Sequence, residues 1–225
     1  MKTPITISPQ GGTSDTLMQR IAITGGIGSG KSYICKQLQA AGHHIFYCDD
    51  EAKHIIRTHP DVMRELRQLV GDEVYDAEGK LVKSVLAAYL CRGAAYSHQV
   101  DAIVHPRVAE AFVRFCQAHG IRPTEESVGA KSIAAQPWEE KVIALNSLQS
   151  LSPAHTVFME CALLFESGFN RLVDHTVLVH VSHATQTARL MARDHISQEK
   201  AQAWMNLQLP EERKLQLADA VIVNE

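Results

Sequence analysis

The sequence lacks the long apolar runs that mark membrane proteins. No stretch approaches the roughly 20 consecutive apolar residues that a membrane-spanning helix needs. The N-terminal stretch MKTPITISPQGGTSDTLMQR also lacks the apolar segment of a secretory signal. We therefore expect a cytoplasmic location and no membrane partner. A net positive charge is missing too, since the formal net charge is -3, so no broad positive field favours nucleic acid as a partner.

Cysteine and histidine patterns typical of disulfides or zinc sites are absent as well. The five cysteines are odd in number, widely spaced and form no CxxC pair. The twelve histidines include no HExxH or other paired-ligand spacing. We predict that the cysteines are reduced core residues and expect no zinc site. The cysteines are Cys35, Cys48, Cys91, Cys116 and Cys161.

What is present is the pattern of a folded α/β protein. Hydrophobic residues make up 45% of the 225 residues and charged residues 21%, which is typical of a globular domain. Short apolar runs alternate with helical patterns, and this alternation predicts a doubly wound, five-stranded parallel sheet in which the first two strands are neighbours. The predicted strands are residues 20–24, 44–48, 156–165, 176–181 and 220–223.

The spacing of these runs predicts an interrupted core. Residues 1–19 show no periodic apolar pattern and are expected to form a flexible extension, while the core should comprise residues 20–58 and 155–225. About a hundred residues without a strong strand signal separate the second and third runs. Their helical patterns predict an inserted helical substrate domain over 59–154, in which the extra segment 119–154 has no functional interpretation. The helical patterns lie near residues 60–70, 82–91, 97–118 and, more weakly, 138–150.

The string GGIGSGKS, Gly25 to Ser32, matches the phosphate-binding pattern G-x-x-x-x-G-K-[ST] between a strand and a helix. Its glycines let the backbone curl so that successive amides point inward, and the helix that begins at Lys31 adds its positive end. Lys31 is expected at the β- and γ-phosphates, and the Ser32 hydroxyl at Mg²⁺. The predicted cofactors are a nucleoside triphosphate, ATP, and Mg²⁺. The predicted nucleotide contacts are Gly26, Ile27, Gly28, Ser29, Gly30, Lys31, Ser32 and Tyr33.

The remaining motifs decide which activity the loop serves. A GTPase switch needs the guanine-reading string NKxD, which is absent, and the only D-x-x-G string, DAEG at 76–79, is predicted to be a polar turn. The second strand ends in the carboxylate cluster YCDDEAK, residues 47–53. There we predict a catalytic role for Asp49, because ligands of open α/β sheets bind at the carboxyl ends of strands. Asp50 and Glu51 are interpreted as helix caps.

Six further strings follow the loop in order, and with them the chain resembles the dephospho-coenzyme A kinase family. The resemblance covers residues 20–224. It implies transfer of the γ-phosphoryl group of ATP to the ribose 3'-hydroxyl of dephospho-coenzyme A, the last step of coenzyme A synthesis. The strings are YCDDEAK, VGDEVYDAEGKLVK, IVHPRV, CALLFE, QTARLMAR and ADAVIVN.

The resemblance also implies roles for single residues. It makes Asp49 the base or orienter of the acceptor hydroxyl. It places Arg189 and Arg193, four residues apart on one helix face, in a lid over about 183–210. Glu160 ends the apolar run VFME in a Walker-B-like position and is predicted to hold Mg²⁺ through water. The remaining motifs imply Asn224 near the adenine, and Lys53, Lys83 and His105 in substrate binding. Tyr47, Lys53, Lys83 and Ala162 stand where the family pattern has Asp, Arg, Arg and Pro.

Two rival functions remain open on the sequence. The chain could be another P-loop metabolite or nucleoside kinase. Alternatively, it could be a nucleotide-binding regulator without turnover, which the altered string YCDD and the end of the chain at Glu225, before the last helix common in the family, would favour. The release of ADP with each candidate acceptor separates these functions. The sequence gives no indication of the oligomeric state.

Overall fold

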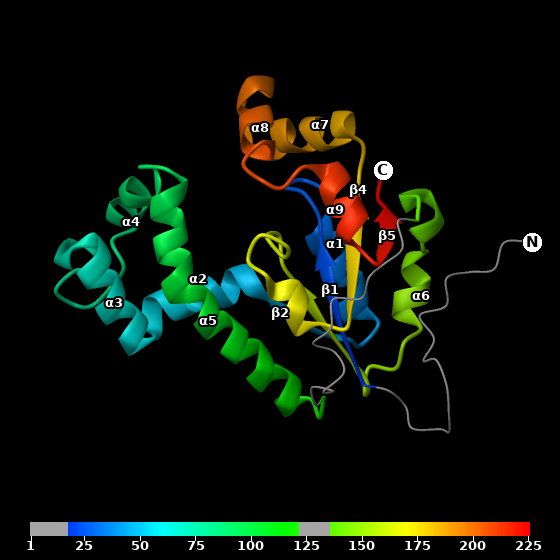
Figure 1. Cartoon of the computed structure of the whole chain (residues 1–225), viewed down its shortest axis with the longest axis horizontal. Coiled ribbons are helices and arrows are strands. Elements are labelled where there is room, and N and C mark those ends of the chain that lie inside the picture. Colours follow the sequence, from blue (N-terminus) through cyan, green and yellow to red (C-terminus); the bar gives the residue numbers. More distant parts are fainter. Residues whose placement is uncertain (1–17, 122–135) are drawn as a thin grey trace, which may run out of the picture. The chain divides into compact units, whose positions relative to one another are not determined.

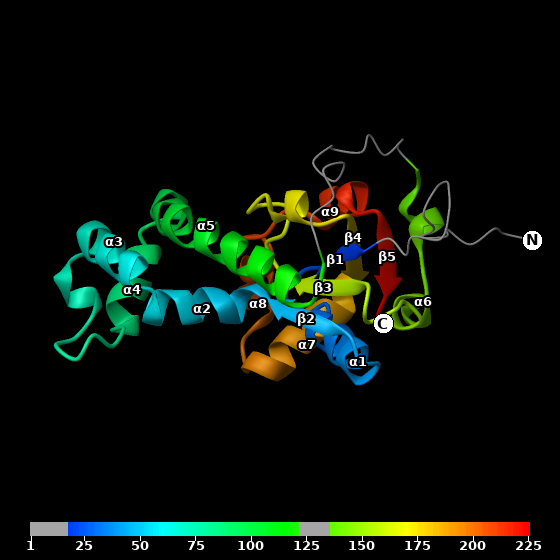
Figure 2. The same cartoon turned by 90° about the horizontal axis from the view of Figure 1, so that it is seen from below.

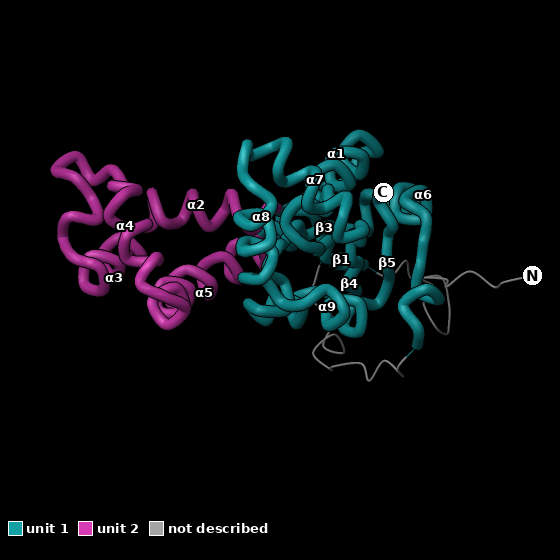
Figure 3. Tube along the Cα trace, turned by 90° about the horizontal axis from the view of Figure 1, so that it is seen from above, with its two compact units in different colours: residues 1–46, 115–225 teal, residues 47–114 magenta. Residues whose placement is uncertain are grey.

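The structure is a computed structural model that describes residues 18–121 and 136–225. It contains two compact units, one formed by Met1–Phe46 with Phe115–Glu225 and the other by Tyr47–Arg114 (Figure 3). The second unit therefore starts and ends earlier in the sequence than the helical domain expected over 59–154. It begins with the helix that follows the second strand, and the described residues from 115 to 154 belong to the first unit. The predicted extension lies almost entirely outside the described residues.

The first unit is built on a five-stranded parallel sheet, which confirms the predicted fold class (Figure 1). The strand order is β2-β3-β1-β4-β5, and β1 pairs with β3 and β4 in parallel. The central strand β1 contains Ile21, Ala22 and Ile23, all fully buried, because helices cover both faces of a parallel sheet. The strands are β1 (Gln19–Thr24), β2 (His44–Tyr47), β3 (Thr156–Glu160), β4 (His175–His180) and β5 (Ala220–Val223).

The position of β2 in the sheet differs from the prediction. The sequence suggested that the first two strands are neighbours, but β3 lies between them. Strands that follow each other in sequence are neighbours only about two-thirds of the time. Here the strand that follows the long helical insertion pairs with β1 instead. The residue beside the end of β1 therefore comes from β3, where Glu160 is in register with Ile23.

Helices cover both faces of this sheet. Helix α1 (Lys31–Ala40) begins where the Gly25–Ser32 loop ends and buries Ile34 and Leu38. Helix α9 (Glu211–Leu217) lies on the opposite face (Figures 2 and 3), where Leu215 shares a buried cluster with residues of β4 and β5. Between β4 and α9 the chain forms α7 (His183–Asp194) and α8 (Gln198–Met205), which lie in the segment predicted to be a lid.

The second unit is mainly helical, as the periodic patterns predict. It contains α2 (Cys48–Thr58), α3 (Pro60–Val70), the short helix η1 (Asp72–Val74), α4 (Lys83–Leu90) and most of α5 (Ala94–Ala118). The string DAEG forms the predicted polar turn. In it, Lys80 N donates a hydrogen bond to Asp76 Oδ1 at 2.7 Å, and Tyr75 pairs with Leu81 across the turn.

The cysteines follow the prediction with one exception. All five are free, but only four are buried, because Cys91 is exposed. Burial raises the pKa of the Cys116 thiol to about 11. Within 18–121 and 136–225, no group of three or more His, Cys, Asp or Glu residues is placed to hold a metal ion. None of the helices in those ranges is both long and apolar enough to cross a membrane.

The segment without a functional interpretation is partly explained by one buried lysine. Lys141 ends the short helix η3 (Trp138–Lys141), and its side chain is almost fully buried. Its Nζ donates to the carbonyl oxygens of Leu215 at 3.2 Å, Gln216 at 3.2 Å and Ala218 at 2.9 Å. These are orphan carbonyls at the C-terminal end of α9, where a positive charge is favourable. This part of the segment therefore fixes α9 to the sheet.

Replacing Lys141 by Met should lower the free energy of unfolding by about 1–3 kcal/mol, because it leaves buried carbonyl groups without their donor. Lys214 provides a matched control. It is as buried as Lys141, and burial lowers its pKa although the Glu166 and Glu211 carboxylates oppose this shift. No hydrogen bond of its ammonium to the carbonyls at the end of a helix is seen among the described residues. Lys214→Met should therefore destabilise the protein less than Lys141→Met, because it leaves no buried carbonyl without its donor. Urea denaturation measures both variants, and equal losses would contradict this account.

Candidate active site

The loop between β1 and α1 has the curled backbone that the motif predicts. Gly28 and Gly30 have φ of +80° and +92°, a left-handed conformation that strains any other residue. Gly26 is a glycine for another reason, since its φ is not positive. A Cβ on Gly26 would lie 2.5 Å from Nε2 of Gln186, and one on Gly28 would lie 3.0 Å from Cγ of Leu190. These two glycines leave room for α7 to pack against the loop.

Lys31 turns back into the loop that precedes it. It is 8% exposed, and its Nζ donates to the carbonyl oxygens of Gly25 at 2.9 Å and Gly26 at 3.2 Å. Hydrogen bonds from an ammonium group to charged phosphate oxygens are stronger than those to neutral carbonyls. Phosphate oxygens in the loop can therefore replace the two carbonyl oxygens as hydrogen-bond acceptors of Lys31. The next residues, Ser32 and Tyr33, are exposed on the first turn of α1, where the Ser32 hydroxyl is accessible.

Glu160 ends β3 beside the strand that leads into the loop. It is 7% exposed and in register with Ile23. Its charge also affects the pKa of the Cys35 thiol on α1. Burial raises the pKa of that thiol most, the Glu160 carboxylate raises it further, and the Lys31 ammonium lowers it. Both charges thus act on Cys35, and the hydroxyl of Ser32 and the carboxylate of Glu160 are oxygen ligands of the kind that a hard cation such as Mg²⁺ prefers.

The two predicted lid arginines have different surroundings. Arg189 NH1 donates to the carbonyl oxygen of Asn224 at 2.9 Å, and Asn224 Nδ2 donates to the carbonyl oxygen of Ser29 at 2.9 Å. Arg189 and Asn224 are therefore brought to the loop. Arg193 instead pairs with Asp194 at 2.7 Å, and its side chain is 58% exposed. That hydrogen bond raises the pKa of Arg193 and lowers the pKa of Asp194.

The carboxylates of the second unit lie in the first turn of α2. Asp49 is exposed there. The interpretation of Asp50 and Glu51 as helix caps is wrong, because α2 begins at Cys48 and its cap position is Tyr47, which makes no capping hydrogen bond. Their charges instead lie near the positive end of the helix. Asp50 also pairs with Lys53 at 3.0 Å on the exposed surface.

The other predicted substrate residues also belong to the second unit. Lys83 is exposed and is the first residue of α4. His105 lies within α5, and its Nε2 is 3.5 Å from Asp101 Oδ1. The structure places both in the unit expected to bind the acceptor, and their roles stay predictions.

The comparison with known proteins identifies the family. The family model described as "Dephospho-CoA kinase" matches residues 19–123 and 140–225. The chain belongs to the dephospho-CoA kinase family. A dephospho-CoA kinase of Bacteroides fragilis is 33% identical over 206 residues, covering 92% of this chain and 84% of that protein. One from Salinibacter ruber is 30% identical, covering 92% and 89%.

Solved structures resemble the fold of this chain. A crystal structure of a Thermus thermophilus protein has a TM-score of 0.67 at 26% identity, covering 93% of this chain and 90% of that one. A structure titled dephospho-CoA kinase from Campylobacter jejuni has a TM-score of 0.57 at 19% identity, covering 91% and 87%. At 19% identity, the Campylobacter jejuni structure supports the fold alone. The resemblance drawn from the ordered motifs is confirmed by the family match.

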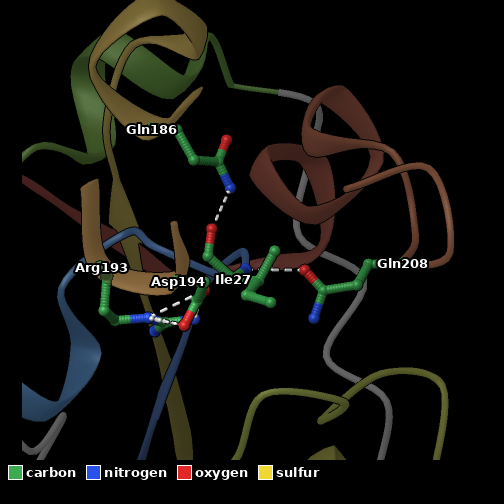
Figure 4. Close-up of polar contacts among 5 residues, drawn as sticks. All are labelled: Ile27, Gln186, Arg193, Asp194 and Gln208. Carbon is green, nitrogen blue, oxygen red and sulfur yellow. Dashed lines mark hydrogen bonds and ion pairs between the residues drawn. The ribbon is translucent and has the colours of Figure 1, made fainter. Parts of the chain in front are cut away.

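Sequence reasoning missed two glutamines that contact the loop directly. Gln186 Nε2 donates to the carbonyl oxygen of Ile27 at 2.6 Å, and Ile27 N donates to Gln208 Oε1 at 2.7 Å (Figure 4). Gln186 is the first residue of the string QTARLMAR, in which a role was predicted for the two charged arginines only. Gln208 lies in none of the motifs quoted above. A neutral side chain in a polar connection gives no local signal of such a contact.

Replacing Lys31 by Met should lower kcat/KM for ATP by roughly 10²–10³-fold, as expected for the removal of one pre-placed donor from a developing charge. Lys36→Met is the matched control, because Lys36 is an exposed lysine on the same helix. Steady-state kinetics and calorimetric ATP titration measure both variants. If Lys31→Met and Lys36→Met behave alike, the assignment of the phosphate loop is wrong.

Proposed function

We propose that the chain transfers the γ-phosphoryl group of ATP to the ribose 3'-hydroxyl of dephospho-coenzyme A, the last step of coenzyme A synthesis, in the cytoplasm. The observation that carries this proposal is the family match across residues 19–123 and 140–225, which includes a glycine loop with the curled backbone of a phosphate site. A general nucleotide-binding role would account for the loop but not for the match in the helical unit.

The loop and its neighbours would hold the triphosphate. The amides from Gly28 onward and the positive end of α1 suit phosphate oxygens, and Lys31 exchanges its carbonyl partners for the β- and γ-phosphates. Ser32 and, through water, Glu160 would hold Mg²⁺, which when bound offsets charge on the phosphates. The bound adenine is assigned to the segment that ends at Asn224.

The reaction itself needs an acceptor oxygen in line with the γ-phosphorus. The ribose 3'-oxygen bonds to that phosphorus, the bond from the phosphorus to the bridging oxygen breaks, and ADP leaves. We assign the acceptor proton to the Asp49 carboxylate. Phosphoryl transfer depends mainly on positioning and charge stabilisation, so this carboxylate does not have to be strongly basic.

The arginines of α7 would offset charge that spreads over the transferred group. Arg189 is already at the loop, because it bonds the backbone of Asn224. Arg193 would have to exchange Asp194 for phosphate. We assign substrate contacts to Lys53, Lys83 and His105. The two lysines offer point charges where arginines would offer a planar fork with fixed geometry.

Asp49→Asn should lower kcat with dephospho-coenzyme A by about 10² to 10⁴-fold, the usual contribution of a general base, with ATP affinity nearly unchanged. The substitution keeps the shape of the side chain and an acceptor oxygen but removes the charge that accepts a proton. Coupled ADP-release kinetics, ATP titration and thermal melting measure these effects.

Asp50→Asn is the matched control for Asp49→Asn, since Asp50 is the adjacent exposed carboxylate and has a surface partner in Lys53. A stable Asp49→Asn variant with the turnover of the parent would return Asp49 to a purely structural role. If the parent releases ADP with a nucleoside but not with dephospho-coenzyme A, the proposed acceptor is wrong and the proposed reaction class stands.

Arg189→Ala should lower kcat more than it raises the Michaelis constant for ATP, because the guanidinium is proposed to act on charge that develops in the transition state. Arg193→Ala is the comparison on the same helix. It should show a smaller loss, because Arg193 is engaged by Asp194. A change confined to the Michaelis constant of Arg189→Ala would make Arg189 a binding residue only.

A further inference from the structure

Two glutamines hold both polar groups of one residue at the tip of the phosphate loop. Gln186 donates to the Ile27 carbonyl oxygen at 2.6 Å, and Gln208 accepts from the Ile27 amide at 2.7 Å. They come from different elements, Gln186 from α7 and Gln208 from the connection between α8 and α9 (Figure 4). Gln186 is 8% exposed. The Ile27 backbone is thus held from two sides by side chains distant in sequence.

The planarity of the peptide bond transmits these contacts into the loop. In a trans peptide the carbonyl and the following N–H point in opposite directions. When Gln208 holds the Ile27 amide, the Gly26 carbonyl must therefore face the other way. There it accepts from Lys31 Nζ at 3.2 Å and from Ser29 N at 3.1 Å.

The same reasoning applies to the next peptide. Because Gln186 holds the Ile27 carbonyl, the Gly28 N–H points away from Gln186. Among the described residues, this N–H has no hydrogen-bond acceptor. The two glutamines thus determine the direction of one carbonyl that contacts the loop lysine and of one amide that a phosphate oxygen can approach.

Packing alone does not require these polar contacts. Leu190 already fills the space beside Gly28, and an apolar side chain of similar length at position 186 or 208 would cover the loop as well. Such a side chain would leave the Ile27 amide or carbonyl without its partner, so the corresponding peptide would be less firmly oriented. The contacts therefore matter for the orientation of the loop more than for its burial.

We propose that Gln186 and Gln208 are positioning residues that orient the peptides on either side of Ile27, so that the Gly28 amide and Lys31 are directed for phosphate binding. This inference rests on the proposed phosphate site. Neither glutamine touches the reacting atoms in the proposal. Both act through the loop backbone, and they couple α7 and the α8–α9 connection to the nucleotide.

A pair of charge-matched variants tests the inference. Gln186→Glu and Gln208→Glu each place one carboxylate beside the same residue, so any repulsion of ATP is common to both. Gln208→Glu keeps an acceptor for the Ile27 amide, whereas Gln186→Glu loses the donor and places its oxygens against the Ile27 carbonyl. We expect kcat/KM for ATP to fall at least roughly 10-fold further in Gln186→Glu, since small misplacements of a site can cost up to about 100-fold.

A third variant and a second readout cover the other outcomes. Gln208→Met removes the acceptor, so hydrogen exchange at the Ile27 amide without nucleotide should accelerate in Gln208→Met but not in Gln208→Glu. Thermal melting checks that each variant is folded. Equal kcat/KM in the two Glu variants, together with unchanged amide exchange in Gln208→Met, would overturn the inference. If the parent binds ATP but does not phosphorylate dephospho-coenzyme A, the proposed function fails. The positioning role is then tested by the ATP affinities of the same variants, which should fall further in Gln186→Glu than in Gln208→Glu.

Discussion

The close approach of α7 to the phosphate loop is the constraint on which the rest of the site depends. Gly26 and Gly28 favour it, because a side chain at either position would crowd Gln186 or Leu190. Once α7 is in this place, Arg189 reaches the backbone of Asn224, which itself bonds the loop. The glycines of the motif therefore serve two purposes. Some let the backbone curl around phosphate, and others admit the helix that carries the predicted lid arginines.

Much of the fold could be predicted because it is encoded in local patterns. Strands buried on both faces leave continuous apolar runs, so β1 and β5 were predicted almost residue for residue. Helix α3 was predicted at its observed bounds, since its apolar positions recur at helical spacing and Pro60 occupies its first turn. The phosphate loop was predicted for a similar reason, because its chemistry depends on neighbouring backbone amides and on residues within one short string.

What could not be predicted depends on contacts between distant parts of the chain. No local pattern reveals that β3 lies between β1 and β2, so the pairing of Glu160 with Ile23 at the end of β1 could not be predicted from the sequence. The start of α2 directly after Tyr47 placed Asp50 and Glu51 inside the helix, because no polar residue separates strand from helix to act as its cap. Gln208 was missed because its partner lies 181 residues away.

The segment 119–154, for which the sequence suggested no function, contacts α9, and α9 follows the connection that carries Gln208. Lys141 binds the carbonyls at the C-terminal end of this helix. Ahead of the helix, Glu166 Oε1 accepts a hydrogen bond from Leu209 N at 2.9 Å, and the preceding residue, Gln208, holds the amide of Ile27. The chain that follows Gln208 is therefore held at Leu209 and at the end of α9, which limits the freedom of Gln208 to leave the loop. Residues that never contact the nucleotide can therefore affect the geometry of its phosphate site.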